Sequence, residues 1–120
     1  MMTLLIVDDQ PTIRQGLRMR LALESDLQIA GEAADGIEAI ELTHALKPSV
    51  VLMDIAMPRM DGITATKAIC AIAPNTRVVV VSLYNDLDMR EQARFAGASA
   101  FVDKHAEDEE LLKAIRRSDR

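Results

Sequence analysis

The sequence VVLMDIAMPRMDG, residues 50–62, contains an apolar run that ends at an aspartate. Val50 to Met53 are four consecutive apolar residues, which is typical of a strand buried on both faces, as in a parallel sheet. Aspartate is a poor strand former. Asp54 is therefore either a turn residue or a charge at the carboxyl end of a central strand, and the remaining sequence decides between the two.

Strand-like and helix-like segments alternate along the chain. The other apolar runs are 4–7, 78–81 and 100–102, and a fifth candidate strand is 27–33. Helical periodicity extends from residue 11 to 21, from just after Gly36 towards 46 and ending before Pro48, from 62 towards 74, from about 86 to 95, and from 108 to 117. Strand–helix pairs repeated five times predict an α/β fold, with a doubly wound parallel sheet and helices on both of its faces.

The composition argues against several classes of function. A chain of 120 residues is long enough for one domain with its own core. Its net charge of -5 argues against nucleic-acid binding by this domain, because phosphate contacts need a basic surface. The single cysteine, Cys70, rules out an internal disulfide and a cysteine-based metal site. The N-terminal residues lack the cationic start of a signal peptide, and no apolar run approaches the roughly 20 residues that cross a membrane, so we expect a cytoplasmic location without membrane contact.

Polar residues follow the predicted strands where each strand ends. Asp8 and Asp9 come directly after the first strand, and Asp54 follows the third. In a doubly wound sheet these two strands can be neighbours, and ligands bind beyond the carboxyl ends of the strands. Ser82 ends the fourth strand, and Lys104 lies just after the fifth. We therefore expect these five side chains to converge at one edge of the sheet.

Three carboxylates at one edge of a sheet call for a cation. Two carboxylates about 4 Å apart repel each other by roughly 4 kcal/mol at an effective dielectric constant of about 20. The three aspartates carry three negative charges, which a divalent ion and Lys104 together would balance. Oxygen ligands without cysteine or histidine favour a hard ion, so the cluster predicts Mg²⁺ rather than Zn²⁺.

At this point the sequence resembles a known family, the response-regulator receiver domain of two-component signalling. The stretches that carry the resemblance are LLIVDDQP, VVLMDIAMPRMDG, VVVVSLYND and GASAFVDK, in family order and spacing over nearly all of the chain. The stretches DDQPTIRQGL, AADGIEAIEL and LLKAIR are similar to the NarL/FixJ/LuxR-type branch. The resemblance implies a flavodoxin-like (βα)5 three-layer sandwich whose five parallel strands have the order 2-1-3-4-5.

The resemblance implies that Asp54 is the phosphoacceptor. Its carboxylate would attack the phosphohistidine of a sensor histidine kinase and form an aspartyl phosphate. Asp9 and Asp54 would bind Mg²⁺ directly, together with the backbone carbonyl of Ala56, and Asp8 would act through a bound water. Because the ion offsets charge on the transferring oxygens, catalysis would consist mainly of positioning and electrostatics.

The resemblance also implies a switch. Lys104 would pair with the phosphoryl group, and Ser82 would donate a hydrogen bond to it and draw in the loop after the fourth strand. Phe101, which matches the switch aromatic, would move inward, so that the surface of the last two helices and the fifth strand changes. His105 stands where the family commonly has a proline, which puts a cis peptide bond after Lys104 in doubt.

The full-length protein is open to two interpretations. Relatives in this branch usually continue into a helix-turn-helix DNA-binding domain, whereas residues 1–120 hold only the receiver. We interpret the chain as the receiver of a transcription factor with a LuxR-type output domain. The alternative is a stand-alone, single-domain regulator that signals through protein contacts. In either case phosphorylation could produce a homodimer.

Two rival functions remain for a sequence of this kind. Phosphatases of the haloacid dehalogenase type also use an aspartate nucleophile after a strand, but they carry a second aspartate two residues later, where this chain has Ala56. We therefore expect self-labelling and no enzymatic turnover. The other rival is a receiver fold that binds partners without phosphorylation, and the complete acidic cluster argues against it.

Overall fold

Five strands and five helices alternate in the computed structural model, which describes residues 1–117. The strands are β1 (Met2–Val7), β2 (Leu27–Ala33), β3 (Val50–Met53), β4 (Arg77–Ser82) and β5 (Ala100–Asp103). The helices are α1 (Pro11–Leu21), α2 (Gly36–Leu46), α3 (Gly62–Ile72), α4 (Leu87–Ala96) and α5 (Asp108–Arg116). This alternation confirms the predicted order of elements.

Three strands are longer than their apolar runs predicted. β1 begins at Met2, whose backbone pairs with Leu27 of β2, and Ser82 of β4 pairs with Asp103 of β5. The extra residues at the strand ends belong to the strands because their backbones pair with a neighbouring strand, and this pairing does not require an apolar side chain. The helix predicted to reach residue 117 ends one residue earlier, at Arg116.

The sheet is entirely parallel and has the strand order β2-β1-β3-β4-β5, which confirms the predicted doubly wound fold. β1 and β3 lie side by side at the centre, with Val7 opposite Met53. The next residue of each strand is an aspartate, and the amide of Asp54 donates to the carbonyl of Val7 at 3.0 Å. The order of the strands therefore brings the two aspartate-bearing ends together.

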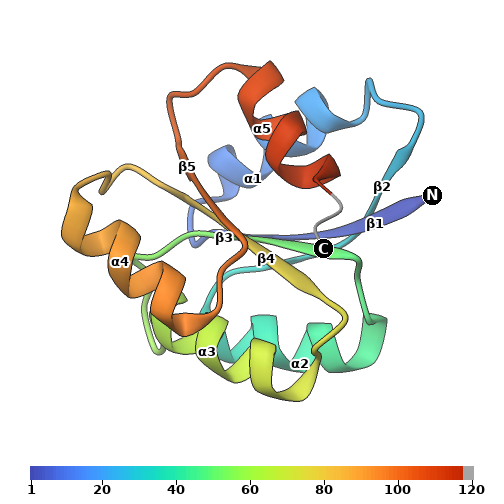
Figure 1. Ribbon diagram of the computed structural model, residues 1–120. Helices are drawn as coiled ribbons and strands as arrows, with labels where there is room; N and C mark the ends of the chain where they lie inside the picture. The colour runs from blue at the N-terminus through green and yellow to red at the C-terminus, as the bar shows by residue number, and fades with distance from the viewer. Residues whose placement is uncertain (118–120) are drawn as a thin grey trace.

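The helices cover both faces of the sheet (Figure 1). Helices α1 and α5 lie on one face, and α2, α3 and α4 lie on the other. Alternate residues of each central strand enter opposite cores: Leu4 and Ile6 pack towards α1 and α5, and Leu5 and Val7 pack towards the other three helices. This burial on both faces explains why the central strands are continuous apolar runs.

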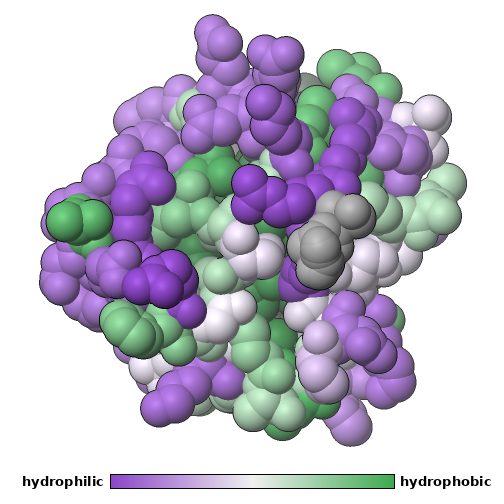
Figure 2. Space-filling view, viewed as in Figure 1, coloured by the Kyte–Doolittle hydropathy of each residue, from purple (hydrophilic) through white to green (hydrophobic). Residues whose placement is uncertain are grey.

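The face of the molecule seen in Figure 2 is hydrophilic over α5 and much of α4. A strip of hydrophobic surface runs between α4 and α5, where β5 lies. A hollow of about 190 Å³ between α4 and β5 is lined by residues that include Ala93, Ala100 and Phe101. Among residues 1–117, no helix has the length and apolar character needed to cross a membrane.

Candidate functional site

Three aspartates meet at the carboxyl ends of β1 and β3. One carboxylate oxygen from each of Asp8, Asp9 and Asp54 lies within 4.8 Å of the other two. Asp8 is only 2% exposed and Asp54 only 6%, so these charges are not ordinary surface acids. Neither Asp8 nor Asp9 caps α1, because the N-cap position is occupied by Gln10. The predicted convergence of the acidic residues is thus present.

Lys104 joins this cluster from the loop after β5. Its ammonium group lies 2.7 Å from Oδ2 of Asp8 and 3.2 Å from Oδ1 of Asp54. The amide of Lys104 donates to the carbonyl of Ser82 at 3.0 Å, so the ends of β4 and β5 are fixed to each other. Ser82 is completely buried, and its Oγ accepts a hydrogen bond from the amide of Tyr84 at 3.0 Å.

The cluster is electrostatically unbalanced around Asp54. Burial, and then the charge of Asp8, raise the pKa of Asp54 from 3.8 to about 6, although Lys104 acts in the opposite direction. Burial lowers the pKa of Lys104, but its ion pairs with the two aspartates outweigh burial and raise it above its ordinary value. The ionised form of Asp54 is therefore destabilised in the fold, which is the condition that a bound cation relieves.

The loop between β3 and α3 shapes the environment of Asp54. The amide of Gly62 donates to the carbonyl of Ile55 at 2.8 Å, and a Cβ atom on Gly62 would lie 1.9 Å from the carbonyl oxygen of Asp54. Only glycine fits there, because any side chain would collide with backbone. Asp61 caps α3 by accepting from the amide of Thr64 at 2.8 Å. The helical periodicity predicted a helix that begins at residue 62, as found, but the contact between Gly62 and Asp54 was not predicted.

The same loop is tied to the start of α2. Asp35 caps α2 by accepting from the amide of Glu38 at 2.9 Å, and it also forms an ion pair with Arg59 at 2.5 Å. The amide of Gly36 donates to the carbonyl of Met60 at 3.1 Å. These contacts fix the loop that follows Asp54. The hydrogen bond from the amide of Glu38, and then the interaction with Arg59, hold the pKa of Asp35 below its ordinary value.

Comparison with known proteins shows the family of this chain. The family described as the response regulator receiver domain matches residues 4–116. This chain belongs to that family. The receiver is 42% identical over 112 residues to the uncharacterized transcriptional regulatory protein YhcZ of Bacillus subtilis, covering 93% of the chain and 52% of that protein. It is 37% identical over 116 residues to the transcriptional regulatory protein LiaR of the same species, covering 97% of the chain and 55% of that protein.

Solved structures show the same fold. The signal receiver domain of the putative response regulator NarL from Mycobacterium tuberculosis has a TM-score of 0.90 and 34% identity, covering 95% of this chain and 92% of that one. The CheX–CheY–BeF₃–Mg complex from Borrelia burgdorferi has a TM-score of 0.88 and 30% identity, covering 95% of this chain and 86% of that one. The relatives are response regulators of the NarL/LuxR type, and the receiver spans about half the length of the curated relatives it matches.

The predicted switch residue of the receiver, Phe101, is only half-buried. The guanidinium carbon of Arg90, on α4, lies 4.9 Å from the centre of the Phe101 ring. Arg90 also donates to Asn85 at 2.8 Å, and Asn85 donates to Asp103 at 3.0 Å. These contacts link the loop after β4 to β5. They could not be predicted from the sequence, because they join side chains on separate elements.

Two further predicted features of the receiver lie near the cluster. Ala56 is exposed and borders an open hollow of about 630 Å³, together with Asp9 and Met57. Metal binding by its carbonyl stays a prediction. The peptide bond between Lys104 and His105 is trans, like the other peptide bonds of residues 1–117.

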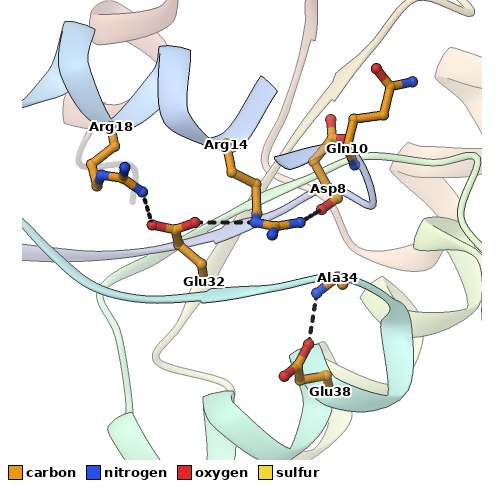
Figure 3. A network of polar contacts seen from close by, with 7 residues as sticks. All are labelled: Asp8, Gln10, Arg14, Arg18, Glu32, Ala34 and Glu38. Carbon is orange, nitrogen blue, oxygen red and sulfur yellow. Dashed lines mark hydrogen bonds and ion pairs between the residues drawn. The ribbon is translucent and has the colours of Figure 1, made fainter. Parts of the chain in front are cut away.

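One contact of the acidic cluster was missed. Arg14 of α1 donates from Nη1 to the carbonyl oxygen of Asp8 at 2.6 Å, and Glu32 of β2 accepts from Nε of Arg14 at 3.1 Å (Figure 3). In the sequence, Arg14 stands three residues before Leu17 and seven before Leu21, and so on the face of α1 that turns towards the sheet. That position indicates a half-buried side chain, but not its partners.

Proposed function

We propose that this receiver accepts a phosphoryl group on Asp54 from the phosphohistidine of a sensor histidine kinase, with both proteins in the cytoplasm. The observation that carries the proposal is the position of Lys104, which bridges the buried carboxylates of Asp8 and Asp54 at 2.7 and 3.2 Å. A partly buried lysine beside a nucleophilic carboxylate provides a fixed positive charge where the phosphoryl oxygens would lie.

The acidic cluster fits Mg²⁺. Its three carboxylate oxygens lie within 4.8 Å of one another, and hard oxygen ligands are the kind that Mg²⁺ prefers. Asp9 and Asp54 would bind the ion directly with the carbonyl of Ala56, and Asp8 would act through a water. When bound, the ion supplies positive charge that stabilises the oxygens of the transferring phosphoryl group. The CheY complex from Borrelia burgdorferi, which contains Mg and BeF₃, supports this assignment.

The chain's own residues would perform the transfer. A carboxylate oxygen of Asp54 attacks the phosphorus, the new O–P bond forms as the P–N bond to the histidine breaks, and the imidazole takes the electron pair. Lys104 is already within 3.2 Å of Asp54 and would pair with a phosphoryl oxygen. Ser82 accepts a hydrogen bond from Tyr84 through Oγ, which leaves its own O–H free to donate to that group.

The response to phosphorylation would pass through the loop after β4. Movement of Ser82 towards the phosphoryl group pulls on the residues that follow it, including Asn85. Asn85 is hydrogen-bonded to both Arg90 and Asp103, and Arg90 lies over Phe101. Displacement of this loop would therefore release Phe101 to move inward and would change the surface formed by α4, β5 and α5.

In the full-length protein, this surface would control a C-terminal LuxR-type DNA-binding domain. The curated relatives are transcriptional regulatory proteins, and this chain spans about half of their length, which supports the proposal. A single-domain regulator that signals through protein contacts is the alternative. The hydrophobic strip between α4 and α5 (Figure 2) is a suitable surface for a homodimer, and an elution volume unchanged by a phosphoryl mimic would argue against one.

Intact-mass analysis with acetyl phosphate and Mg²⁺ tests the phosphoacceptor. We expect one Mg²⁺-dependent phosphoryl adduct on the wild type and none on Asp54→Asn. We also expect labelling without turnover of p-nitrophenyl phosphate, because Ala56 stands where a dehalogenase-type phosphatase has its acid. Sustained turnover would favour the phosphatase, and absence of an adduct on the wild type would favour a fold used only for binding.

A further inference from the structure

Arg14 contacts the acidic cluster from outside it (Figure 3). Its guanidinium group lies between two acceptors, the carbonyl oxygen of Asp8 at 2.6 Å and the carboxylate of Glu32 at 3.1 Å. The side chain of Arg14 is 18% exposed and that of Glu32 27%, so both contacts are partly shielded from solvent. Charge-assisted hydrogen bonds of this kind are about twice as strong as neutral ones.

The carbonyl that Arg14 binds belongs to the peptide group between Asp8 and Asp9. The other polar groups of Asp8 already have partners. The amide of Asp8 donates to the carbonyl of Ala33 at 3.1 Å, and its Oδ1 accepts from the amide of Gln10 at 2.9 Å. Its Oδ2 forms an ion pair with the ammonium group of Lys104 at 2.7 Å. Arg14 completes this set. Asp8 is therefore held at every polar atom, and its orientation does not depend on a bound ion.

Asp9 is held quite differently. Its carboxylate belongs to the acidic cluster, but it has no hydrogen bond or ion pair with any residue in the range 1–117. The direction of its side chain is therefore set by the backbone, which begins at the peptide group that Arg14 holds. A ligand with no contacts of its own is the ligand whose geometry depends most on backbone support.

Glu32 makes it possible for a cation to act so close to a metal site. An uncompensated guanidinium beside Asp8 would repel a divalent ion. The carboxylate of Glu32 offsets that charge and fixes the plane of the guanidinium group between β2 and the loop after β1. Lysine could not replace Arg14 fully, because one ammonium group lacks the two fixed donor directions.

We infer that Arg14, held by Glu32, is a positioning residue for the metal site. It fixes the peptide group between Asp8 and Asp9, and so directs the carboxylate of Asp9 towards Asp8 and Asp54. This inference rests on the proposed function, since it concerns the same Mg²⁺ site. Arg14 touches neither the phosphoryl group nor the ion, and acts only through the backbone.

The chain provides a matched control for the test. Arg18 lies one turn further along α1 and forms an ion pair with the other oxygen of Glu32, but it has no contact with Asp8. Arg14→Gln and Arg18→Gln therefore each remove one positive charge and one contact with Glu32, and only the first removes the hydrogen bond to Asp8. Comparing the two separates positioning from the loss of charge.

The experiment is isothermal titration of the metal-free wild type, Arg14→Gln, Arg14→Lys and Arg18→Gln with Mg²⁺. We expect the dissociation constant to rise about tenfold in Arg14→Gln, the usual effect of losing an outer partner of a ligand. We expect it to be intermediate in Arg14→Lys and unchanged in Arg18→Gln. Equal dissociation constants in Arg14→Gln and Arg18→Gln would overturn the inference.

A second measurement separates positioning from a general loss of structure. The rate of labelling by acetyl phosphate is followed against Mg²⁺ concentration. We expect the half-saturating concentration to rise in Arg14→Gln while the rate at saturating Mg²⁺ changes little. A lower plateau with an unchanged half-saturating concentration would contradict the inference. If Arg14→Gln does not fold, Glu32→Gln is the second variant, and it too must weaken Mg²⁺ binding.

The outcome for the wild type keeps the two proposals distinct. A wild type that binds Mg²⁺ and is labelled, with Arg14→Gln indistinguishable from Arg18→Gln, refutes only the role of Arg14. A wild type that neither binds Mg²⁺ nor becomes labelled refutes the proposed function, and the inference falls with it.

Discussion

The charge of Asp54 opposes folding when no metal is bound, so Asp54→Asn is predicted to stabilise the metal-free protein. Burial of the carboxylate and the neighbouring charge of Asp8 raise the pKa of Asp54 from 3.8 to about 6. A pKa raised by this amount corresponds to about 3 kcal/mol. This value already includes the opposing ion pair with Lys104, and it is an upper bound because solvent partly screens the carboxylate.

The pH dependence follows from the direction of the pKa change. Because the pKa of Asp54 is raised in the fold, the protonated side chain contributes stability that is fully present below 3.8 and lost as the pH rises through about 6. Asparagine stays neutral throughout. The advantage of Asp54→Asn is therefore small below pH 3.8, increases between 3.8 and about 6, and is constant at higher pH.

Differential scanning calorimetry in EDTA is a direct assay. The entropy of unfolding is about 2.1 cal/mol/K per residue, so 1 kcal/mol shifts the Tm of a chain of this length by about 4 °C. We expect Asp54→Asn to exceed the wild type by up to about 10 °C at about pH 8, with a much smaller difference at about pH 4.5. Glu41→Gln, which removes an exposed carboxylate on α2, is the control and should change little. A variant no more stable than the wild type at about pH 8 would refute the reasoning.

Two other substitutions test the surroundings of the cluster. Gly62→Ala places a Cβ atom 1.9 Å from the carbonyl oxygen of Asp54, and we expect a loss of more than about 2 kcal/mol in urea unfolding. Gly16→Ala is the control, because a Cβ atom at Gly16 meets nothing within 4 Å, and we expect this variant to be as stable as the wild type or more stable. An equal loss of stability in both variants would contradict the steric argument. Lys104→Met removes the cation that pairs with Asp8 and Asp54, so we expect labelling by acetyl phosphate to slow by at least tenfold and the metal-free protein to lose stability. Labelling at the wild-type rate would show that Lys104 has no part in the transfer.

The sequence was sufficient for those parts of the fold that depend on local pattern. Val50 to Met53 are buried on both faces, and their apolar run predicted this. The meeting of Asp8 and Asp54 was predictable as well, because the carboxyl ends of neighbouring parallel strands lie at the same edge.

Contacts between distant elements were less predictable. Lys104 follows β5, and the strands β3 and β4 lie between β5 and β1 in the sheet. The contact of Lys104 with Asp8 therefore depends on the strand order and on a long side chain. The hydrogen bond from Arg14 to the backbone of Asp8 has no periodic signal at all. The stacking of Arg90 on Phe101 is a similar case, since the two residues lie on α4 and β5.

The most direct test of the account is to locate the modified residue. The wild type is labelled with acetyl phosphate and Mg²⁺, reduced with borohydride to convert an aspartyl phosphate into homoserine, and sequenced by tandem mass spectrometry. We expect homoserine at position 54 and aspartate at positions 8 and 9. Homoserine at position 8 or 9, or phosphate retained on a serine, threonine or histidine, would contradict it.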